Sequence, residues 1–103
     1  MYKITLDKKV LKDLKNIDKK DQVKIVDIIE NRLAKDPFIG KRLAGNLSDF
    51  YRYRFKNYRI IYLIFKDKIE IEIIKIGHRK DVYKKNKWQN KFSLQKITIV
   101  RNK

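Results

Sequence analysis

The sequence predicts an α+β fold in which a twisted sheet carries two helices on one face. Three observations favour it. The chain begins with an alternating apolar run, continues with two stretches that have apolar residues at helical steps, and ends its main part with three strand-like runs. A strand, a helical hairpin and a three-stranded antiparallel meander in this order form one sheet with the helices packed on it. With 103 residues, a single domain with a modest core is expected.

The first strand and the first helix come from residues 2–17. Residues 2–6 alternate between apolar and polar side chains, which is typical of a strand. Asp7 follows and offers an N-cap to a short helix. The apolar stripe predicted for this helix consists of Val10, Leu11, Leu14 and Ile17.

A second, longer helix is predicted to begin at Asp18, which can cap it. It ends before Pro37, because the residue that precedes a proline, here Asp36, disfavours helical geometry. Gly40 and Gly45 then bracket a loop rich in turns. The predicted apolar stripe of the helix consists of Val23, Ile25, Val26, Ile29 and Leu33.

Three strands are predicted after this loop, over residues 50–55, 58–65 and 69–76. The second and third are dense in Ile, Leu, Tyr and Phe, as inner strands are. Residues 66–68 connect them tightly, and Gly77 is expected to end the last one. Because the helices cover one face of the sheet, the other face is left for polar groups and a partner.

The strand at 50–55 reads Phe-Tyr-Arg-Tyr-Arg-Phe, and its alternation assigns Arg52 and Arg54 to one face. Two guanidinium groups on one face must lie in water or against anions. The whole chain has 28 Lys and Arg against 12 Asp and Glu, a net charge of +16, so a polyanion such as nucleic acid is the expected partner. Solvation of an exposed sheet face is the alternative for both arginines.

Composition also excludes several classes of site. The chain has no cysteine, so disulfides, thiolate metal sites and cysteine nucleophiles are ruled out. Its single histidine cannot build a multi-histidine metal site, and no metal or other cofactor is expected. No apolar stretch approaches the ~20 residues of a membrane span, and the charged N-terminal run does not resemble a signal peptide. We therefore expect no membrane partner and a cytoplasmic location.

Four segments together resemble a known family. They are Leu43-Ala44-Gly45-Asn46-Leu47-Ser48, the strand at 50–55, Tyr58-Arg59-Ile60-Ile61-Tyr62, and the run from Ile76 to Tyr83 that contains Gly-His-Arg. They are similar to the RelE/ParE toxin superfamily, and more narrowly to the RelE-type messenger-RNA interferases of toxin–antitoxin pairs. The resemblance covers roughly residues 2–84 in element order and implies a RelE-like fold.

The resemblance implies an activity. RelE-like toxins enter the ribosomal decoding site and cut the messenger RNA there, by attack of a 2′-hydroxyl that leaves a 2′,3′-cyclic phosphate. The family's basic and tyrosine positions match Arg52 and Arg54 as phosphate-binding residues, and Arg59, Arg79 and Tyr83 as catalytic residues. It also implies messenger RNA, ribosomal RNA and a cognate acidic antitoxin as partners, with the antitoxin forming a hetero-oligomer.

The proton-transfer residue is the open point. Arginine keeps its proton in proteins, so Arg52 and Arg54 cannot act as the base that lysine provides in some family members. Other relatives use a glutamate in the loop before this strand, and the segment Gly40-Lys41-Arg42-Leu43 of that loop has no carboxylate. His78 is left as the side chain that titrates near neutrality, and we assign proton transfer to it, as base or acid. A plain turn role for His78, core packing for Tyr83, and an ion pair of Arg59 with Glu70 or Glu72 are the alternatives.

The last segment departs from the family pattern. We expect a single toxin domain over residues 1–84 and a basic C-terminal extension over 85–103. Trp88 and Phe92 are spaced for a short helix, and residues 94–100 read as a strand or a tail. Trp88 is expected to pack against the domain, with added contact to ribosomal RNA as the alternative for the extension.

Three functions remain open from the sequence. The first is a ribosome-dependent endoribonuclease toxin. The second is a ParE-type poison of DNA gyrase, against which the set of arginines and Tyr83 argues. The third is an inactive relative that only binds RNA or an antitoxin, because the lysine or glutamate base is missing.

Overall fold

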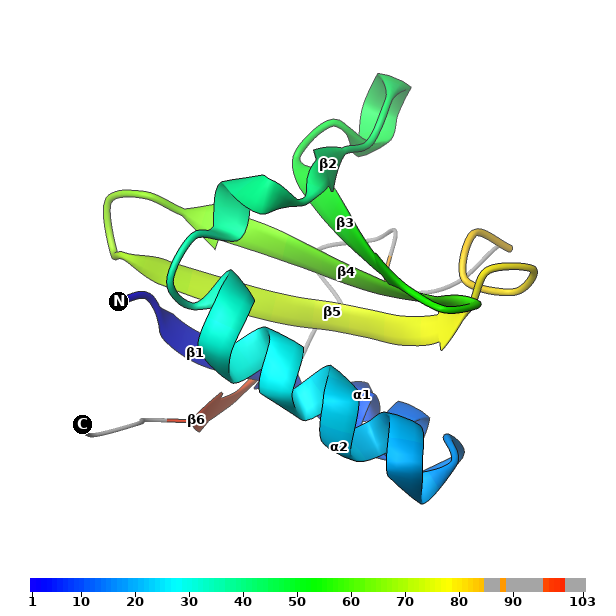
Figure 1. The fold of residues 1–103 in the computed structure, drawn as a ribbon. Coiled ribbons are helices and arrows are strands. Elements are labelled where there is room, and N and C mark those ends of the chain that lie inside the picture. Colours follow the sequence, from blue (N-terminus) through cyan, green and yellow to red (C-terminus); the bar gives the residue numbers. More distant parts are fainter. Residues whose placement is uncertain (85–87, 89–95, 100–103) are drawn as a thin grey trace.

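The computed structural model describes residues 1–84, 88 and 96–99, and contains one six-stranded sheet (Figure 1). Its strand order is β2-β3-β4-β5-β1-β6, and all neighbours are antiparallel except β1 and β5. The strands are β1 (Lys3–Asp7), β2 (Lys41–Arg42), β3 (Phe50–Phe55), β4 (Tyr58–Phe65), β5 (Glu70–His78) and β6 (Lys96–Ile99). The predicted α+β fold, with a helical hairpin between the first strand and the meander, is confirmed. The short edge strand β2 was not predicted.

Asp7 is the N-cap of helix α1 (Lys8–Lys15), as predicted: its carboxylate accepts a hydrogen bond from the backbone N–H of Lys9 at 2.9 Å. Val10 and Ile17 are buried on the sheet and Leu14 packs against the same core. Leu11 was wrongly placed in this stripe, since it is 42% exposed. One helical step of 100° from the buried Val10 turns Leu11 away from the sheet.

Helix α2 (Lys19–Ile28) starts after Asp18, although the Asp18 side chain makes no capping hydrogen bond. A single π-helical turn over Ile29–Leu33 extends it toward Pro37. Val23 was wrongly assigned to its buried stripe and is 65% exposed. The residues of α2 and the π turn that pack in the core are Ile25, Ile28, Ile29 and Leu33. Val26 is half-buried and lines a small pocket beside this core.

The meander β3–β4–β5 forms the middle of the sheet. The hairpin that joins β3 to β4 turns at Lys56, whose φ of 53° is left-handed, and Asn57. A bulge between Ile61 and Tyr62 shifts the register of β4 on β5. Gly77 does not end the last strand: β5 runs through it to His78, because Gly77 still pairs with Arg59 on β4.

The sheet has two different faces. Both helices cover one face, over the apolar side chains of β1, β4 and β5 (Figure 1). Four tyrosines of β3 and β4 pack in this core, namely Tyr51, Tyr53, Tyr58 and Tyr62. The opposite face, called here the open face, has a smaller core of Phe50, Ile61, Leu63, Ile74, Val82 and Trp88.

The C-terminal extension is described at two places. Trp88 is buried on the open face, as expected, and β6 lies within the segment 94–100 that reads as a strand or a tail. Because β6 pairs with β1, it closes that edge of the sheet. The helix expected around Trp88 and Phe92 lies mostly outside the described residues, and the division at residue 84 stays a prediction. In the described part of the chain, no helix is long and apolar enough to span a membrane.

Candidate functional site

Arg52, Arg54 and Arg59 share the open face of the sheet. Arg54 and Arg59 are direct partners in the β3–β4 register, and Arg52 is paired with Ile61, which belongs to the core of the open face. Since paired residues of neighbouring strands project on the same side, all three guanidinium groups leave the sheet opposite to the helices. The alternation of β3 therefore predicted the face of Arg52 and Arg54 correctly.

Arg59 lies at the centre of this set and is half-buried. Burial lowers the pKa of its guanidinium group, and the charges of Arg54, Arg52 and Arg79 act in the same direction. The Tyr83 phenol acts the other way. A guanidinium group remains charged at neutral pH even so. The side chains of Arg52, Arg54, Arg79 and Tyr83 therefore all act electrostatically on Arg59, although the five residues come from separate parts of the sequence.

The ion pair considered for Arg59 is not formed. Glu70 and Glu72 lie opposite Phe65 and Leu63 at the far end of β4, whereas Arg59 lies opposite Gly77. In the part of the chain that the structure describes, the ion pairs join other residues: Lys3 with Glu70, Lys56 with Asp21, Lys75 with Asp13, and Lys84 with Asp81. None of the guanidinium groups of Arg52, Arg54, Arg59 and Arg79 has an acidic partner there, so their charge is available to an external anion.

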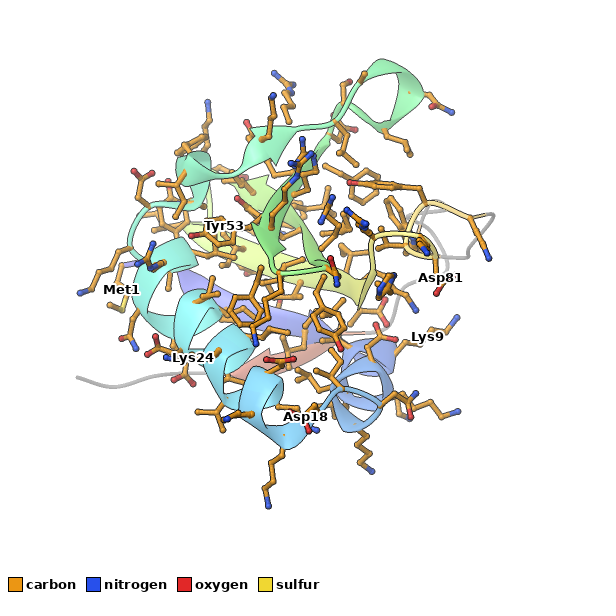
Figure 2. All side chains as sticks on the ribbon, turned by 45° about the vertical axis from the view of Figure 1, so that its right-hand side comes forward. Met1, Lys9, Asp18, Lys24, Tyr53 and Asp81 are labelled. Atoms are coloured by element: carbon orange, nitrogen blue, oxygen red, sulfur yellow. The ribbon has the colours of Figure 1, made fainter. Side chains whose placement is uncertain are left out.

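Arg79 and Tyr83 come from the turn that follows β5. The backbone N–H of Arg79 donates to the Asn57 carbonyl at 2.6 Å, which ties this turn to the β3–β4 hairpin. The N–H groups of Asp81 and Val82 both donate to the His78 carbonyl and close the turn. Tyr83 is 40% exposed. Figure 2 shows nitrogen-tipped side chains gathered between β3 and the turn that carries Asp81. We call Arg52, Arg54, Arg59, Arg79 and Tyr83 the cationic face.

His78 is not part of the cationic face, and its expected place beside the arginines is corrected by the structure. It pairs with Tyr58 on β4, and the two rings are 6.2 Å apart in an edge-to-face arrangement. Tyr58 packs in the core under the helices, so His78 also lies on the helix side. The reason is the alternation of β5: Gly77 shares a face with Arg59, and the next residue must point the other way.

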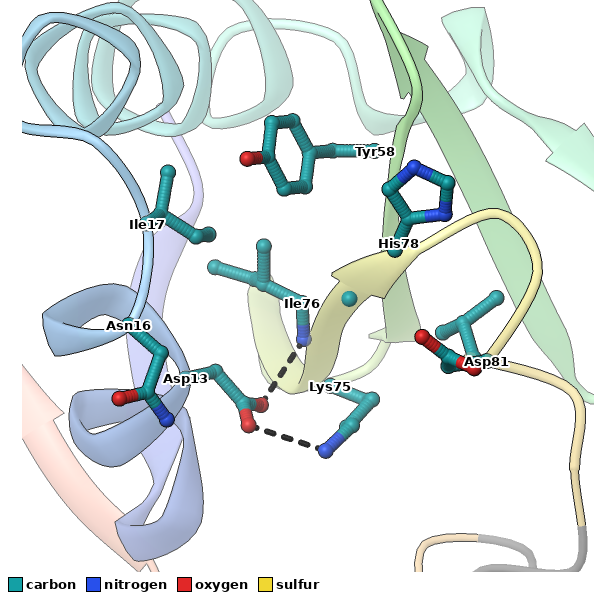
Figure 3. Close-up of a pocket in the computed structure, with 10 residues that line it drawn as sticks. Asp13, Asn16, Ile17, Tyr58, Lys75, Ile76, His78 and Asp81 are labelled. Carbon is teal, nitrogen blue, oxygen red and sulfur yellow. Dashed lines mark hydrogen bonds and ion pairs between the residues drawn. The ribbon is translucent and has the colours of Figure 1, made fainter.

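His78 instead lines a pocket of about 450 Å³ at the edge of β5 beneath α1 (Figure 3). The floor is apolar and includes Ile17 and Ile76. At its rim, the Asp13 carboxylate accepts hydrogen bonds from Lys75 Nζ at 2.9 Å and from the Ile76 N–H at 3.1 Å. These hydrogen bonds join α1 to β5, so Asp13 and Lys75 at the rim of the pocket hold the helix on the sheet.

Sequence reasoning missed one cation beside the cationic face. Lys41 on β2 is paired with Arg52, so it projects on the same side of the sheet and extends the positive charge toward the edge. β2 has only two residues, too few for a visible alternation. Among residues 1–84, 88 and 96–99, no three His, Cys, Asp or Glu side chains gather in a group that could hold a metal ion.

Comparison with known proteins identifies the family. Residues 4–83 match the ParE toxin family of type II toxin–antitoxin systems. The chain belongs to this RelE/ParE toxin family. A relative from Methanocaldococcus jannaschii, named as a candidate RelE1 toxin, is 34% identical to this chain over 87 residues. The match covers 81% of the toxin and 96% of the relative. The predicted membership of this superfamily is confirmed.

Solved structures show the same fold. The RelB–RelE antitoxin–toxin complex of Methanococcus jannaschii matches with a TM-score of 0.61 at 26% identity, over 77% of this toxin and 94% of that chain. The RelBE2 complex of Mycobacterium tuberculosis matches with a TM-score of 0.71 at 23% identity, over 76% of this toxin and 98% of that chain. The isolated RelE toxin of E. coli matches with a TM-score of 0.65 at 20% identity, over 76% of this toxin and 84% of that chain. The family match ends at Tyr83, so Trp88 and β6 lie beyond it.

Proposed function

We propose that this toxin is a ribosome-dependent endoribonuclease that cuts messenger RNA in the decoding site. The observation that carries the proposal is the cationic face. Four guanidinium groups and one phenol, drawn from β3, β4 and the turn after β5, gather on the face that the helices leave uncovered. None of the four has an acidic partner in the described residues, which suits a phosphodiester and its more highly charged transition state.

In the proposed reaction, the 2′-oxygen of the RNA forms a bond to the adjacent phosphorus while the bond from phosphorus to the 5′-oxygen breaks. The products are a 2′,3′-cyclic phosphate and a 5′-hydroxyl. Arg59 and Arg79 stabilise the charge that develops on the phosphorane oxygens, and Arg52 and Arg54 hold the flanking phosphates. The four arginines of the cationic face keep their protons. We therefore assign to Tyr83 the role of the acid that donates a proton to the leaving 5′-oxygen.

The proton of the attacking 2′-hydroxyl needs a separate acceptor. The arginines of the cationic face cannot accept it, and His78 lies on the other side of the sheet. We propose that a group of the ribosome, or of the RNA held there, takes this proton. The cleavage would then depend on the ribosome for chemistry as well as for placing the substrate.

The partner that neutralises the toxin follows from the same surface. The solved relatives include toxins bound to their antitoxins. We propose that a cognate antitoxin with acidic residues covers the cationic face, since that face attracts anions and an acidic segment bound there would exclude RNA. Toxin and antitoxin would form a hetero-oligomer in the cytoplasm.

Mapping of RNA ends after expression of the toxin tests the proposal. New 5′-hydroxyl ends should appear inside coding regions, in register with codons, and should vanish when translation initiation is blocked. A matched variant, Arg79→Gln, should give few such ends at equal protein level. Purified toxin should cut messenger RNA only when programmed ribosomes are present.

The matched family carries the name of ParE, so gyrase poisoning is the second candidate. Intact messages together with double-strand DNA breaks would support it and contradict RNA cleavage. Tight RNA binding without cleavage, with or without ribosomes, would identify an inactive relative.

A further inference from the structure

Trp88 lies beyond the part of the chain that matches the toxin family, yet it is packed in the core of the open face and contacts Tyr83 of the cationic face. It is the single tryptophan of the chain and is 4% exposed. Its ring meets Phe50 of β3 edge-on, with centroids 5.1 Å apart, and so rests on the core of the open face. This anchorage fixes the indole on the rigid part of the sheet.

The indole also contacts the turn after β5 at two neighbouring residues. Its Nε1–H donates to the Val82 carbonyl at 2.8 Å, and its ring lies 6.5 Å from the Tyr83 ring at an angle of 63°. Val82 is fully buried and Tyr83 is 40% exposed. Trp88 therefore holds the peptide group that joins the two residues and also one side of the phenol ring.

We propose that Trp88 is a positioning residue that holds the Tyr83 hydroxyl beside Arg59. The inference rests on the proposed function, because it assigns a task to the residue that supplies the proton there. Tyr83 stands on a turn outside the strand ladder, where side chains are more mobile than in the sheet. An error of about 1 Å in the placement of a reacting group can cost up to ~10²-fold in rate, so such a support has a measurable effect.

Single-turnover cleavage on programmed ribosomes tests this. Trp88→Leu removes the ring and the N–H, and should lower the cleavage rate by about 10- to 100-fold while ribosome affinity stays within about twofold. Trp88→Phe keeps an aromatic ring but loses the hydrogen bond, and should recover part of the rate. In a Tyr83→Phe background, Trp88→Leu should have almost no further effect, because it acts through Tyr83.

Tyr62→Phe is the matched control for loss of stability. It too removes a buried hydrogen bond to a backbone carbonyl, from the Tyr62 hydroxyl to Pro37 at 2.6 Å, but on the helix side of the sheet. If Tyr62→Phe lowers the melting temperature as much as Trp88→Phe and keeps the parental cleavage rate, the effect of Trp88 is positional. Equal rate losses in the two variants would mean that Trp88 acts only through stability.

A second measurement does not depend on cleavage. Three-bond NMR couplings across χ1 of labelled Tyr83 should report one rotamer in the parent and in Tyr62→Phe, and averaging in Trp88→Leu. If the parent cuts no RNA, the proposed function fails while these couplings still decide the inference. If the parent cuts RNA but Trp88→Leu retains both the single Tyr83 rotamer and the parental rate, the inference is overturned.

Discussion

Arg54 and Arg59 stand directly opposite each other across β3 and β4, with both guanidinium groups on the face that the helices leave uncovered. Like charges at paired positions of a sheet destabilise it. Among the neighbouring charges that lower the pKa of Arg59, the charge of Arg54 has the largest effect. The pair therefore weakens the isolated toxin and favours the binding of an anion between the two groups.

Arg54→Gln should stabilise the free toxin by up to about 1 kcal/mol, because it removes the charge opposite Arg59. The same variant should bind RNA and the programmed ribosome more weakly. Urea unfolding and a binding titration measure the two effects. Arg32→Gln is the matched control, since Arg32 is exposed after α2 and its guanidinium group reaches the Tyr53 hydroxyl instead. A loss of stability in Arg54→Gln would contradict the proposed repulsion.

Arg52→Ala should reduce the salt dependence of RNA binding. Each phosphate contact releases counterions, so the slope of log affinity against log salt should fall by roughly 0.7 to 0.9 for one lost contact. Lys24→Ala, an exposed cation on the helix side, should leave the slope unchanged. Equal slopes for parent and Arg52→Ala would place the RNA elsewhere.

Arg79→Gln should act mainly on the chemical step. A guanidinium group beside the developing phosphorane interacts most strongly in the transition state, so the single-turnover rate should fall by about 10²- to 10³-fold. Ribosome affinity should change little. If binding and rate fall together in Arg79→Gln, Arg79 is a substrate-binding residue like Arg52.

Tyr83→Phe and His78→Gln separate the two candidates for proton transfer. Tyr83→Phe should slow cleavage by about 10²- to 10⁴-fold, because it removes the phenol proton on the cationic face. His78→Gln should cut at nearly the parental rate, since His78 faces Tyr58 under the helices. If His78→Gln cut slowly while Tyr83→Phe kept the parental cleavage rate, the RNA would instead have to bend round the end of β5 to reach the histidine.

Tyr62 should make the fold less stable at alkaline pH. Burial raises the pKa of its hydroxyl, which donates to the Pro37 carbonyl. The folded state therefore keeps the proton that the unfolded chain releases above about pH 10. The contribution of Tyr62 to stability is complete below that pH and is lost as pH rises further. Tyr62→Phe should unfold with a weaker dependence on pH between 9 and 11; an unchanged dependence would contradict the assignment.

Much of the fold could be predicted because its signals are local. The alternation of residues 50–55 placed Arg52 and Arg54 on one face, and Asp7 marked the start of α1, since both depend on near neighbours in the chain. Leu11 and Val23 were misplaced because helical steps leave the edge of an apolar stripe undefined. Which edge is buried depends on where the helix meets the sheet.

By itself, the sequence determined the order of the elements, the excess of positive charge and the alternation that exposes Arg52 and Arg54. Tertiary structure alone decided which distant residues share their face. The β4–β5 register pairs Arg59 with Gly77, and this pairing turns His78 to the helix side and keeps Arg59 away from Glu70 and Glu72. Tertiary packing also placed Trp88 against Phe50 and the turn that carries Tyr83. Periodicity is set by backbone geometry within a strand, whereas register and packing join segments far apart in the chain.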